Sequence, residues 1–435
     1  MLAFGHKVFA ALPLPRRVEV KLGEWQWAFI AFRISDGACS ILLPGAALLR
    51  YDLGVGGVAG TVAVLNLAAV PAVVLWCRVM DKNAKRRFWT VVGFAVAALA
   101  LLTLAMDIPY WLYLLAAATY AAFGVATAPG ASVLVLQDRP RADWAAATGL
   151  LSRRTGFSYL AGLAVTLTLG LAGQLNTQMI FGVAAFLALL AAGIAARTMP
   201  KLLGTLPAPL AGTEIIMAGQ RRMERLFWFP ARLRNMPRFS ALRSPLLLGV
   251  MAIFAGTVTL MSGFSGILRN ELGFTAGLIV LAQSGAHLAN ASAYRWSGRL
   301  GSLLGEPKVI QWGVWLRSFA LLGLIAAVAW GGPLVIVIIL LFDILLGVSF
   351  SLIQVNTPCH IAANHTGGAA AGVGAYHAAV SAGVLGGSLI GWALSASVGL
   401  TAVYMASFVL VILGAAVVVK QVGKRAVPDD AVGAV

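Results

Sequence analysis

Charged residues are scarce in this chain of 435 residues. Asp, Glu, Lys and Arg together make up 11%, whereas 60% of the residues are hydrophobic and the mean hydropathy is +0.89. An average soluble domain is about one quarter charged and less than half apolar. The composition therefore excludes a soluble globular enzyme. It also excludes a disordered chain, because disorder requires low hydrophobicity.

Cysteine is equally scarce, and no cluster of residues suggests a metal centre. Cys39, Cys77 and Cys359 are scattered through apolar segments and form no Cys-x-x-Cys pair. Neither a disulfide framework nor a zinc site is expected. The signatures of phosphate-binding loops and of hydrolase nucleophiles are missing too. We therefore predict a protein that is not an enzyme and that uses no cofactor and no bound metal.

Long apolar segments, by contrast, recur along the whole chain. Each is long enough to cross a bilayer as a helix, for which about 20 residues suffice. Continuous runs of this length exclude a transmembrane barrel, whose strands are short and alternate in polarity. They form a group of six, a gap and a second group of six. The predicted spans cover residues 24–49, 57–76, 88–106, 110–136, 145–172, 179–196, 245–268, 274–294, 309–330, 334–355, 372–395 and 401–419.

Positive charge is concentrated in alternate loops. The net charge of +17 comes from 32 Lys and Arg against 15 Asp and Glu. Basic residues gather in every second loop and in the central gap, whereas the intervening loops carry only Arg50 and Arg269. By the positive-inside rule the basic loops face the cytoplasm. We expect a multi-pass protein of the plasma (inner) membrane with both termini in the cytoplasm. This placement explains the charge without a nucleic-acid partner.

The central gap combines basic and aromatic residues, which is typical of an amphipathic surface segment. We expect it to contact anionic lipid headgroups. Docking of a protein partner there remains open. The predicted organisation is a cytoplasmic N-terminal segment (1–23), an N-terminal six-helix bundle (24–197), a basic cytoplasmic linker (198–243), a C-terminal six-helix bundle (244–420) and a cytoplasmic tail (421–435).

Two loops carry a repeated pattern. The loop after the second predicted helix runs Cys77-Arg-Val-Met-Asp81-Lys82-Asn-Ala84-Lys-Arg86-Arg87. It resembles the loop signature of the major facilitator superfamily, Gly-x3-Asp-Arg/Lys-x-Gly-x-Arg/Lys-Arg/Lys, with both glycines replaced. The corresponding loop of the second half starts at Gly298 and keeps the two glycines at the same spacing, with Ser302 in the acidic position. The two loops are complementary degenerations of one pattern.

The resemblance implies an all-α membrane protein with twelve transmembrane helices in two pseudo-symmetric six-helix bundles. It also implies secondary transport of a small-molecule substrate by alternating access. The matching positions of the first loop would then form a cytoplasmic gate. These positions are Asp81, Lys82, Arg86 and Arg87.

Ionisable residues inside apolar spans are costly and are functional candidates by default. Arg33, Asp36 and Ser40 fall on one face of the first predicted helix, with Asp36 near its middle. We predict that Asp36 or Asp343 carries a coupling proton. Arg33 has two interpretations, because it either holds an anionic substrate or neutralises Asp36 one turn away.

Polar stripes on other spans indicate the remaining contacts. The eighth predicted helix carries Gln283, His287, Asn290 and Tyr294 at offsets of four, three and four. Arg317, on a ninth helix expected to be peripheral, is predicted to snorkel to the headgroups. The predicted substrate contacts are Arg33, Tyr120, Arg154, His287, Asn290, Gln354 and His377.

The predicted function is secondary active transport with proton coupling, and the buried arginine and histidine favour a small organic anion. Two alternatives remain. One is an exporter of lipophilic molecules or drugs, although Tyr120 stands where drug antiporters of the superfamily carry arginine and residues 156–162 lack their proline. The other is a non-transporting protein on the same fold that handles lipid or pigment or assembles a membrane complex.

Overall fold

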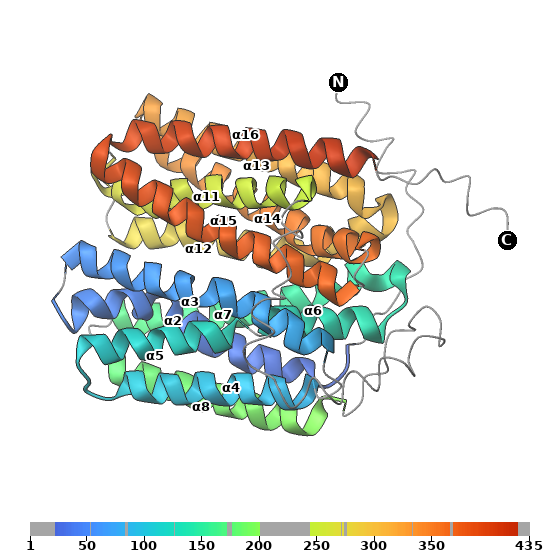
Figure 1. Cartoon of the computed structure of the whole chain (residues 1–435). Helices are drawn as coiled ribbons and strands as arrows, with labels where there is room; N and C mark the ends of the chain where they lie inside the picture. The colour runs from blue at the N-terminus through green and yellow to red at the C-terminus, as the bar shows by residue number, and fades with distance from the viewer. Residues whose placement is uncertain are drawn as a thin grey trace, which may run out of the picture.

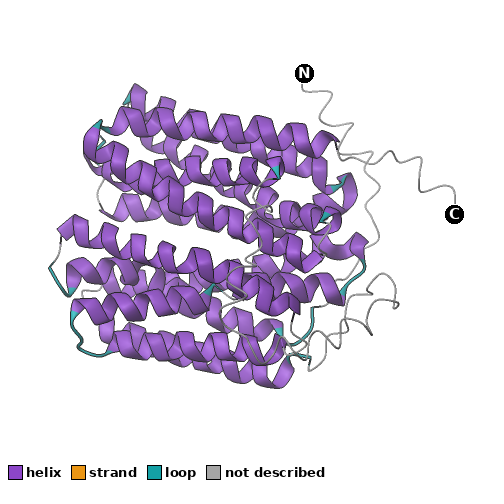
Figure 2. Ribbon diagram, in the orientation of Figure 1, coloured by secondary structure: helices purple, strands orange, loops and turns teal. Residues whose placement is uncertain are grey.

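The computed structural model describes residues 22–52, 54–82, 86–125, 127–171, 176–200, 244–270, 272–273, 276–332, 334–365 and 369–424. These residues form long helices joined by turns, without any strand (Figure 2). The first half contains α2 (Gln26–Leu49), α3 (Gly54–Lys82), α4 (Arg86–Ala105), α5 (Tyr110–Gly124), α6 (Thr127–Asp138), η1 (Arg141–Asp143), α7 (Trp144–Leu171) and α8 (Thr177–Thr198). The second half contains α11 (Pro245–Asn270), α12 (Ala276–Leu304), α13 (Glu306–Trp330), α14 (Val335–Asn364), α15 (Ala369–Ser397) and α16 (Leu400–Lys424).

The helices of each half lie together, and the two groups lie one against the other (Figure 1). Helices occupy all twelve predicted spans, which confirms the predicted all-α membrane class. Within the described segments, six helices are long and apolar enough to cross a membrane by length and composition alone. We call the end of the molecule at which α8 ends and α11 begins the linker end. The linker itself, over residues 201–243, lies outside the described residues.

Several helices continue beyond their apolar segments at the linker end. The eighth span, predicted to end at residue 294, runs to Leu304 in α12. The tenth, predicted to end at residue 355, runs to Asn364 in α14 and contains Pro358. Hydropathy marks where lipid contact stops, whereas a helix continues as long as its backbone hydrogen bonds propagate.

The fourth span is broken, although the sequence predicts one helix there. The first piece, α5, ends at Gly124, and α6 starts at Thr127. Pro129 explains the break, since proline has no N–H to donate to the carbonyl of Val125, four residues earlier. The new helix, α6, therefore has the proline in its first turn, at its third residue.

Close helix crossings repeat in both halves. A Cβ atom at Gly37 of α2 would lie 2.0 Å from the carbonyl oxygen of Tyr159 on α7. In the second half, a Cβ atom at Gly387 of α15 would lie 2.3 Å from the carbonyl oxygen of Ala255 on α11. Small residues let helix backbones meet in lipid, where packing replaces the hydrophobic effect as the driving force. The first and fifth passages of each half thus pack in the same way.

Buried hydroxyl groups repeat in the same manner. Ser35 on α2 donates a hydrogen bond to the carbonyl oxygen of Ala184 on α8 at 2.8 Å. Ser407 on α16 donates to the carbonyl oxygen of Gly256 on α11 at 2.7 Å. Each bond joins the first and the last passage of its half. The repeated contacts support the duplicated architecture inferred from the loop patterns.

Candidate functional site

Three polar side chains meet in the interior of the first half. Arg33 and Asp36 lie one turn apart on α2 and form an ion pair, in which the Arg33 Nη1 donates to the Asp36 carboxylate. Tyr120 on α5 donates from its hydroxyl to the other Asp36 oxygen at 3.0 Å. The Tyr120 ring stacks on Phe32, with centroids 6.3 Å apart, which holds the phenol in place. Of the two interpretations of Arg33, the pairing with Asp36 is the one seen in this state.

Tyr159 on α7 connects this pair to the second half. The Arg33 guanidinium carbon lies 5.6 Å from the centroid of the Tyr159 ring, within cation–π range. The imidazole of His287 on α12 lies 5.6 Å from the same ring, centroid to centroid. We call Arg33, Asp36, Tyr120, Tyr159 and His287 the central cluster. Its members come from α2, α5 and α7 of one half and α12 of the other.

The charged pair of the central cluster is accessible although it lies deep in the molecule. Arg33 keeps 41% of its side-chain surface exposed and Asp36 keeps 27%. Arg33 lies toward Tyr159 on α7, whose ring also contacts His287 on α12. Its accessible surface therefore borders the space between the halves. A solute that enters this space meets one positive and one negative charge.

The second half adds polar groups beside the cluster. Tyr294 on α12 donates a hydrogen bond to Gln354 Oε1 on α14 at 3.1 Å. Buried atoms of two predicted substrate contacts, Asn290 Oδ1 and His377 Nε2, have no hydrogen-bond partner among the described residues. Such atoms are rare in folded proteins, so both side chains have bonding capacity left for a ligand.

The two predicted proton carriers have different surroundings. Asp36 belongs to the accessible central cluster, whereas Asp343 on α14 is only 3% exposed. The Asp343 carboxylate hydrogen-bonds the backbone of Ala286 on α12, and its Oδ2 has no partner in the described part of the chain. At the next turn α14 lies against the same residue of α12, since a Cβ atom at Gly347 would lie 2.2 Å from the carbonyl oxygen of Ala286. Asp343 thus lies within the second half, inside the packing of α14 on α12.

Arg154, a predicted substrate contact, lies toward α2 of its own half. Its Nη1 donates to Gln26 Oε1 near the start of that helix. The predicted gate loop is described only in part. The side chains of Asp81 and Lys82 lie outside the described residues, and Arg86 and Arg87 form the first turn of α4.

The expectation that Arg317 snorkels to the headgroups is wrong. Arg317 on α13 is 3% exposed, and its Nε donates to Thr257 Oγ1 on α11 at 2.8 Å. The rings of Phe254 and Phe350 each lie 5.6 Å from its guanidinium carbon. A hydroxyl acceptor and two aromatic faces thus take the place of the headgroups inside the second half.

The two halves are joined by an ion pair at the linker end. Arg141 in η1 donates from Nη1 and Nη2 to the two carboxylate oxygens of Glu306, the first residue of α13, at 2.5 and 3.0 Å. The Arg141 guanidinium also lies 4.9 Å from the Trp144 ring centroid. The loop motif does not indicate this pair, because its acidic position in the second loop holds Ser302 and the acid, Glu306, comes four residues later.

An apolar cluster closes the linker end behind this pair. Cys359 is 1% exposed and packs with residues from both halves. Its hydrogen-bond partner is Thr148 on α7, at 3.7 Å. The cluster consists of Leu136, Trp144, Cys359, Ala362 and Val373. Together with the ion pair, it makes the linker end the closed end of this structure.

The helices α7 and α12 touch along a seam of glycines. A Cβ atom at Gly149 would lie 2.5 Å from the carbonyl oxygen of Tyr294, and one at Gly298 would lie 2.4 Å from that of Ala145. Farther along, Gly156 faces Ala291. The seam runs from the linker end up to the central cluster.

Tyr159, which joins the two halves of the site, is not among the residues predicted from the sequence. The available signal is its position between Gly156 and Gly162, since glycines in a transmembrane helix mark close approach of a neighbour. Only the packing shows that α2 approaches from one side and α12 from another.

Two solved transporter structures have a fold similar to that of this chain. The crystal structure of a bacterial homologue of the iron transporter ferroportin, in the outward-facing state, has a TM-score of 0.65 at 15% identity and covers 92% of this chain and 99% of that one. FucP, a major facilitator superfamily transporter in the outward conformation, has a TM-score of 0.64 at 15% identity and covers 93% and 98%. At this identity the likeness shows the fold alone.

No curated protein matches the sequence. The family model described as Major Facilitator Superfamily, however, matches residues 27–375, which is most of the chain. The fold, the repeated packing of the two halves and this match together confirm the resemblance found in the loop motif. The chain belongs to the major facilitator superfamily, a family of secondary transporters.

Proposed function

We propose that this protein transports a small organic anion together with a proton by alternating access. The observation that carries the proposal is the Arg33–Asp36 ion pair, which is accessible and lies where the two halves meet. Arginine binds carboxylates through two parallel hydrogen bonds. In this structure the Arg33 guanidinium donates to one oxygen of the Asp36 carboxylate, so a substrate carboxylate competes with Asp36 for Arg33.

A proton decides this competition. When Asp36 is ionised it accepts from Arg33 and Tyr120. Protonation removes its charge and frees the guanidinium to bind the substrate carboxylate. The proton and the anion therefore bind together at adjacent groups. Tyr120 keeps the Asp36 side chain in place during the exchange, since it holds the second oxygen.

Charge balance couples the two solutes. The empty site is neutral, because the charges of Arg33 and Asp36 cancel. The site that holds both a proton and a monovalent anion is also neutral. A site with only one of them has an uncompensated charge, which is strongly disfavoured when the halves close around it and exclude water. Only the empty and the fully loaded forms then change conformation, which is the condition for symport.

Tyr159 and His287 complete the site from the side of the second half. Their ring contact links α7 to α12 next to Arg33. A substrate bound at Arg33 would touch both halves and so favour the closure of the space between them. A divalent cation fits this cluster less well, because it would meet the Arg33 guanidinium before the single carboxylate. The iron named for the ferroportin homologue is therefore not our proposal for this chain.

We propose further that the linker end faces the cytoplasm, in accordance with the charge of its loops. The closed linker end then corresponds to an outward-facing state, the state named for the similar crystal structures. A cytoplasmic linker end places the basic linker beside anionic headgroups of the inner membrane.

Reconstitution into vesicles filled with a pH-sensitive dye tests the proposal. Lactate, malonate, succinate and citrate are added outside in turn, and proton entry is recorded. We expect at least one of them to drive proton entry through the wild-type protein. In Asp36→Asn the guanidinium stays free, so the anion binds but the empty carrier bears an uncompensated charge. This variant should lose proton entry and retain exchange of labelled anion. Arg33→Gln should lose both.

Asp52→Asn provides the matched control. Asp52 is an exposed loop residue with a φ of 54°, a conformation that asparagine also adopts readily. It should behave as the wild type. Undiminished proton entry through Asp36→Asn, or no carboxylate-driven proton entry through the wild type, would contradict the proposal.

A further inference from the structure

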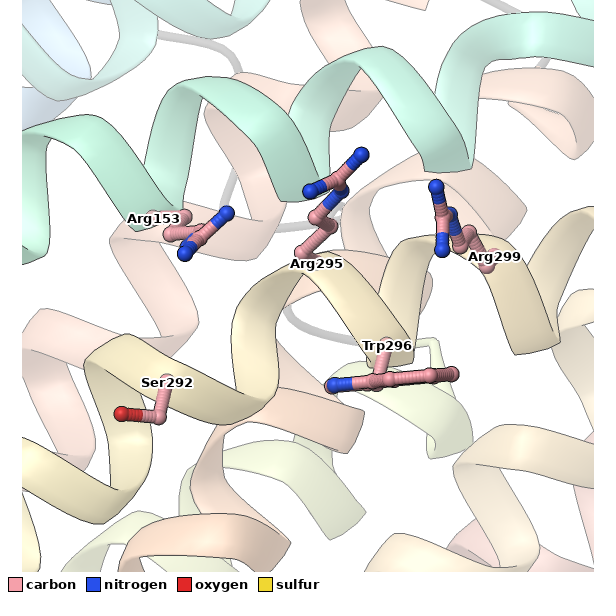
Figure 3. Close-up of a pocket in the computed structure, with 5 residues that line it drawn as sticks. All are labelled: Arg153, Ser292, Arg295, Trp296 and Arg299. Atoms are coloured by element: carbon pink, nitrogen blue, oxygen red, sulfur yellow. The ribbon is translucent and has the colours of Figure 1, made fainter. Parts of the chain in front are cut away.

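A cavity lined largely by arginines lies between the halves, away from the central cluster. It has a volume of about 340 Å³, at the lower end of the range for ligand sites. On α7 its residue Arg153 is six positions before Tyr159, about 120° around the helix, so the two sites use different faces of α7. In Figure 3 the three arginine side chains lie in a row, with Ser292 near the Arg153 end and Trp296 near the Arg299 end. The lining residues are Arg153, Ser292, Arg295, Trp296 and Arg299.

The cavity concentrates positive charge without a balancing carboxylate. No ion pair joins Arg153, Arg295 or Arg299 to an acidic side chain of the described residues. Two of these guanidinium groups instead lie 5.7 Å from aromatic rings, Arg153 over Phe157 and Arg299 over Trp296. Three like charges around one cavity repel each other unless an anion lies between them. Guanidinium groups and a serine hydroxyl are typical partners of a phosphate group.

The surroundings favour a lipid as the source of the phosphate. The arginines of α12 follow directly after its apolar segment, at the level where headgroups meet hydrocarbon. Trp296 is 65% exposed, and an exposed tryptophan is typical of that level. Farther from the linker end, the exposed side chains Phe157 and Leu288 continue the surface of α7 and α12 with apolar groups. A phospholipid matches this arrangement, because its phosphate would lie at the arginines and its acyl chains along the apolar side chains.

Both halves contribute walls to the cavity in this structure, whose linker end is closed. Arg153 belongs to the first half, whereas Arg295 and Arg299 belong to the second. The glycine seam at Gly149 and Gly298 brings the two walls together. If the halves separate at this end, α7 moves away from α12. The Arg153 guanidinium then moves away from those of Arg295 and Arg299. A ligand that bridges the arginines therefore binds the closed state better, and it shifts the equilibrium toward that state.

We propose that this cavity binds the phosphate headgroup of an anionic phospholipid and that the bound lipid holds the linker end closed. The bound lipid acts as a clamp, in the sense that it slows the opening of the linker end that the transport cycle requires. It contacts no residue of the central cluster, so the proposal stands apart from the identity of the transported solute.

Cys359 provides the readout, because it is buried in the apolar cluster that closes the linker end. The full-length chain with Cys39→Ala and Cys77→Ser retains Cys359 alone. It is placed in nanodiscs of phosphatidylcholine, with or without phosphatidylglycerol, and the rate of alkylation by N-ethylmaleimide is measured. Each basic residue near an anionic lipid surface changes binding by about fivefold. We expect phosphatidylglycerol to slow the alkylation of Cys359 by about fivefold or more.

A charge-matched pair of variants locates the effect. The triple variant Arg153→Gln, Arg295→Gln and Arg299→Gln should lose the response to phosphatidylglycerol. The control removes three exposed positive charges at the same end of the molecule and should retain the response. It carries Arg197→Gln, Lys308→Gln and Lys420→Gln. If the triple variant aggregates, Arg153→Gln and Arg295→Gln are measured singly, each with an expected loss of about fivefold in sensitivity to the lipid.

The soluble alternative is tested in the same discs. Inorganic phosphate and glycerol 3-phosphate are added to protein in phosphatidylcholine alone, and we expect no protection of Cys359. Protection by either would overturn the lipid assignment in favour of a soluble phosphate compound. A response that persists in the triple variant, or that is lost equally in the control, would overturn the assignment to this cavity. An alkylation rate indifferent to phosphatidylglycerol in the wild type would overturn the clamp.

Discussion

Gly149→Ala is expected to open the linker end. An alanine methyl group at this position would lie 2.5 Å from the carbonyl oxygen of Tyr294 and 3.0 Å from the Cα atom of Gly298. Carbon and carbonyl oxygen atoms make contact at about 3.3–3.6 Å. Helices α7 and α12 would therefore have to separate by about 1 Å, because the obstacles are backbone atoms and no side chain can turn away.

The magnitude follows from where the clash lies. Inserting a methyl group into a packed contact costs about 1–3 kcal/mol. Since α7 and α12 belong to different halves, opening the linker end relieves the clash without unfolding either half. The cost then appears in the conformational equilibrium, which should shift toward the open linker end by about 5- to 150-fold.

The alkylation rate of Cys359 measures this shift, in the variant that keeps only this cysteine. Closed, the thiol is 1% exposed. Gly149→Ala should raise its reaction rate with N-ethylmaleimide by the same factor as the open population. The mid-point of thermal unfolding should change little.

Two other glycines serve as controls. Gly182→Ala on α8 adds a methyl group that meets nothing within 4 Å, so the alkylation rate should stay at the wild-type value. Gly37→Ala clashes with Tyr159 inside the first half, so it should lower thermal stability in every conformation. Equal alkylation rates in Gly149→Ala and Gly182→Ala would refute the argument that the seam closes the linker end.

Further substitutions test two other contacts, Arg141–Glu306 and Arg317–Thr257. Arg141→Glu should raise the population with an open linker end by about fivefold, since a half-exposed, bidentate ion pair contributes up to about 1 kcal/mol. Adding Glu306→Arg should restore the closed state. Failure of the double variant to recover slow Cys359 alkylation would contradict a direct pairing. Arg317→Met should preserve or raise thermal stability, because it removes a buried charge that no described carboxylate balances. Thr257→Val should lower stability by about 1–3 kcal/mol, because it leaves that guanidinium without its acceptor. A rise in melting temperature with Thr257→Val, recorded by differential scanning fluorimetry in detergent, would show that the contact does not stabilise the charge.

The fold could be predicted from the sequence because the hydrocarbon of the bilayer offers no hydrogen bonds to the backbone. Every backbone polar group in lipid must be satisfied within its own segment, so long apolar runs form helices. The duplicated loop pattern then indicated two related halves. The break at Pro129 was not predicted, since proline is common in transmembrane helices and only the packing shows whether a helix bends or restarts.

The central site was predicted in part, for a physical reason. Arg33 and Asp36 were visible because spacing on one helix places them together and because a charge inside an apolar run is costly. Tyr120 was also among the predicted residues, but its bond to Asp36 depends on how α5 packs beside α2. Arg317 shows the opposite case. Its position inside an apolar span was clear from the sequence, but its burial against Thr257 was not. One face of a transmembrane helix contacts either lipid or another helix, and both surroundings are apolar, so the sequence does not distinguish them.

By itself, the sequence determined the membrane class, the helical spans, the two-fold repetition and the presence of a charge pair in the first span. These properties depend on local composition and on helical periodicity. Tertiary structure alone decided which end is closed, that Glu306 meets Arg141, that Tyr159 links Arg33 to His287, and that three arginines from two halves share one cavity. Each of these is a contact between segments far apart in the chain. Such contacts depend on which helices pack against each other, although their apolar surfaces are similar. That choice rests on small steric features, such as the glycines of the α7–α12 seam, which hydropathy does not register.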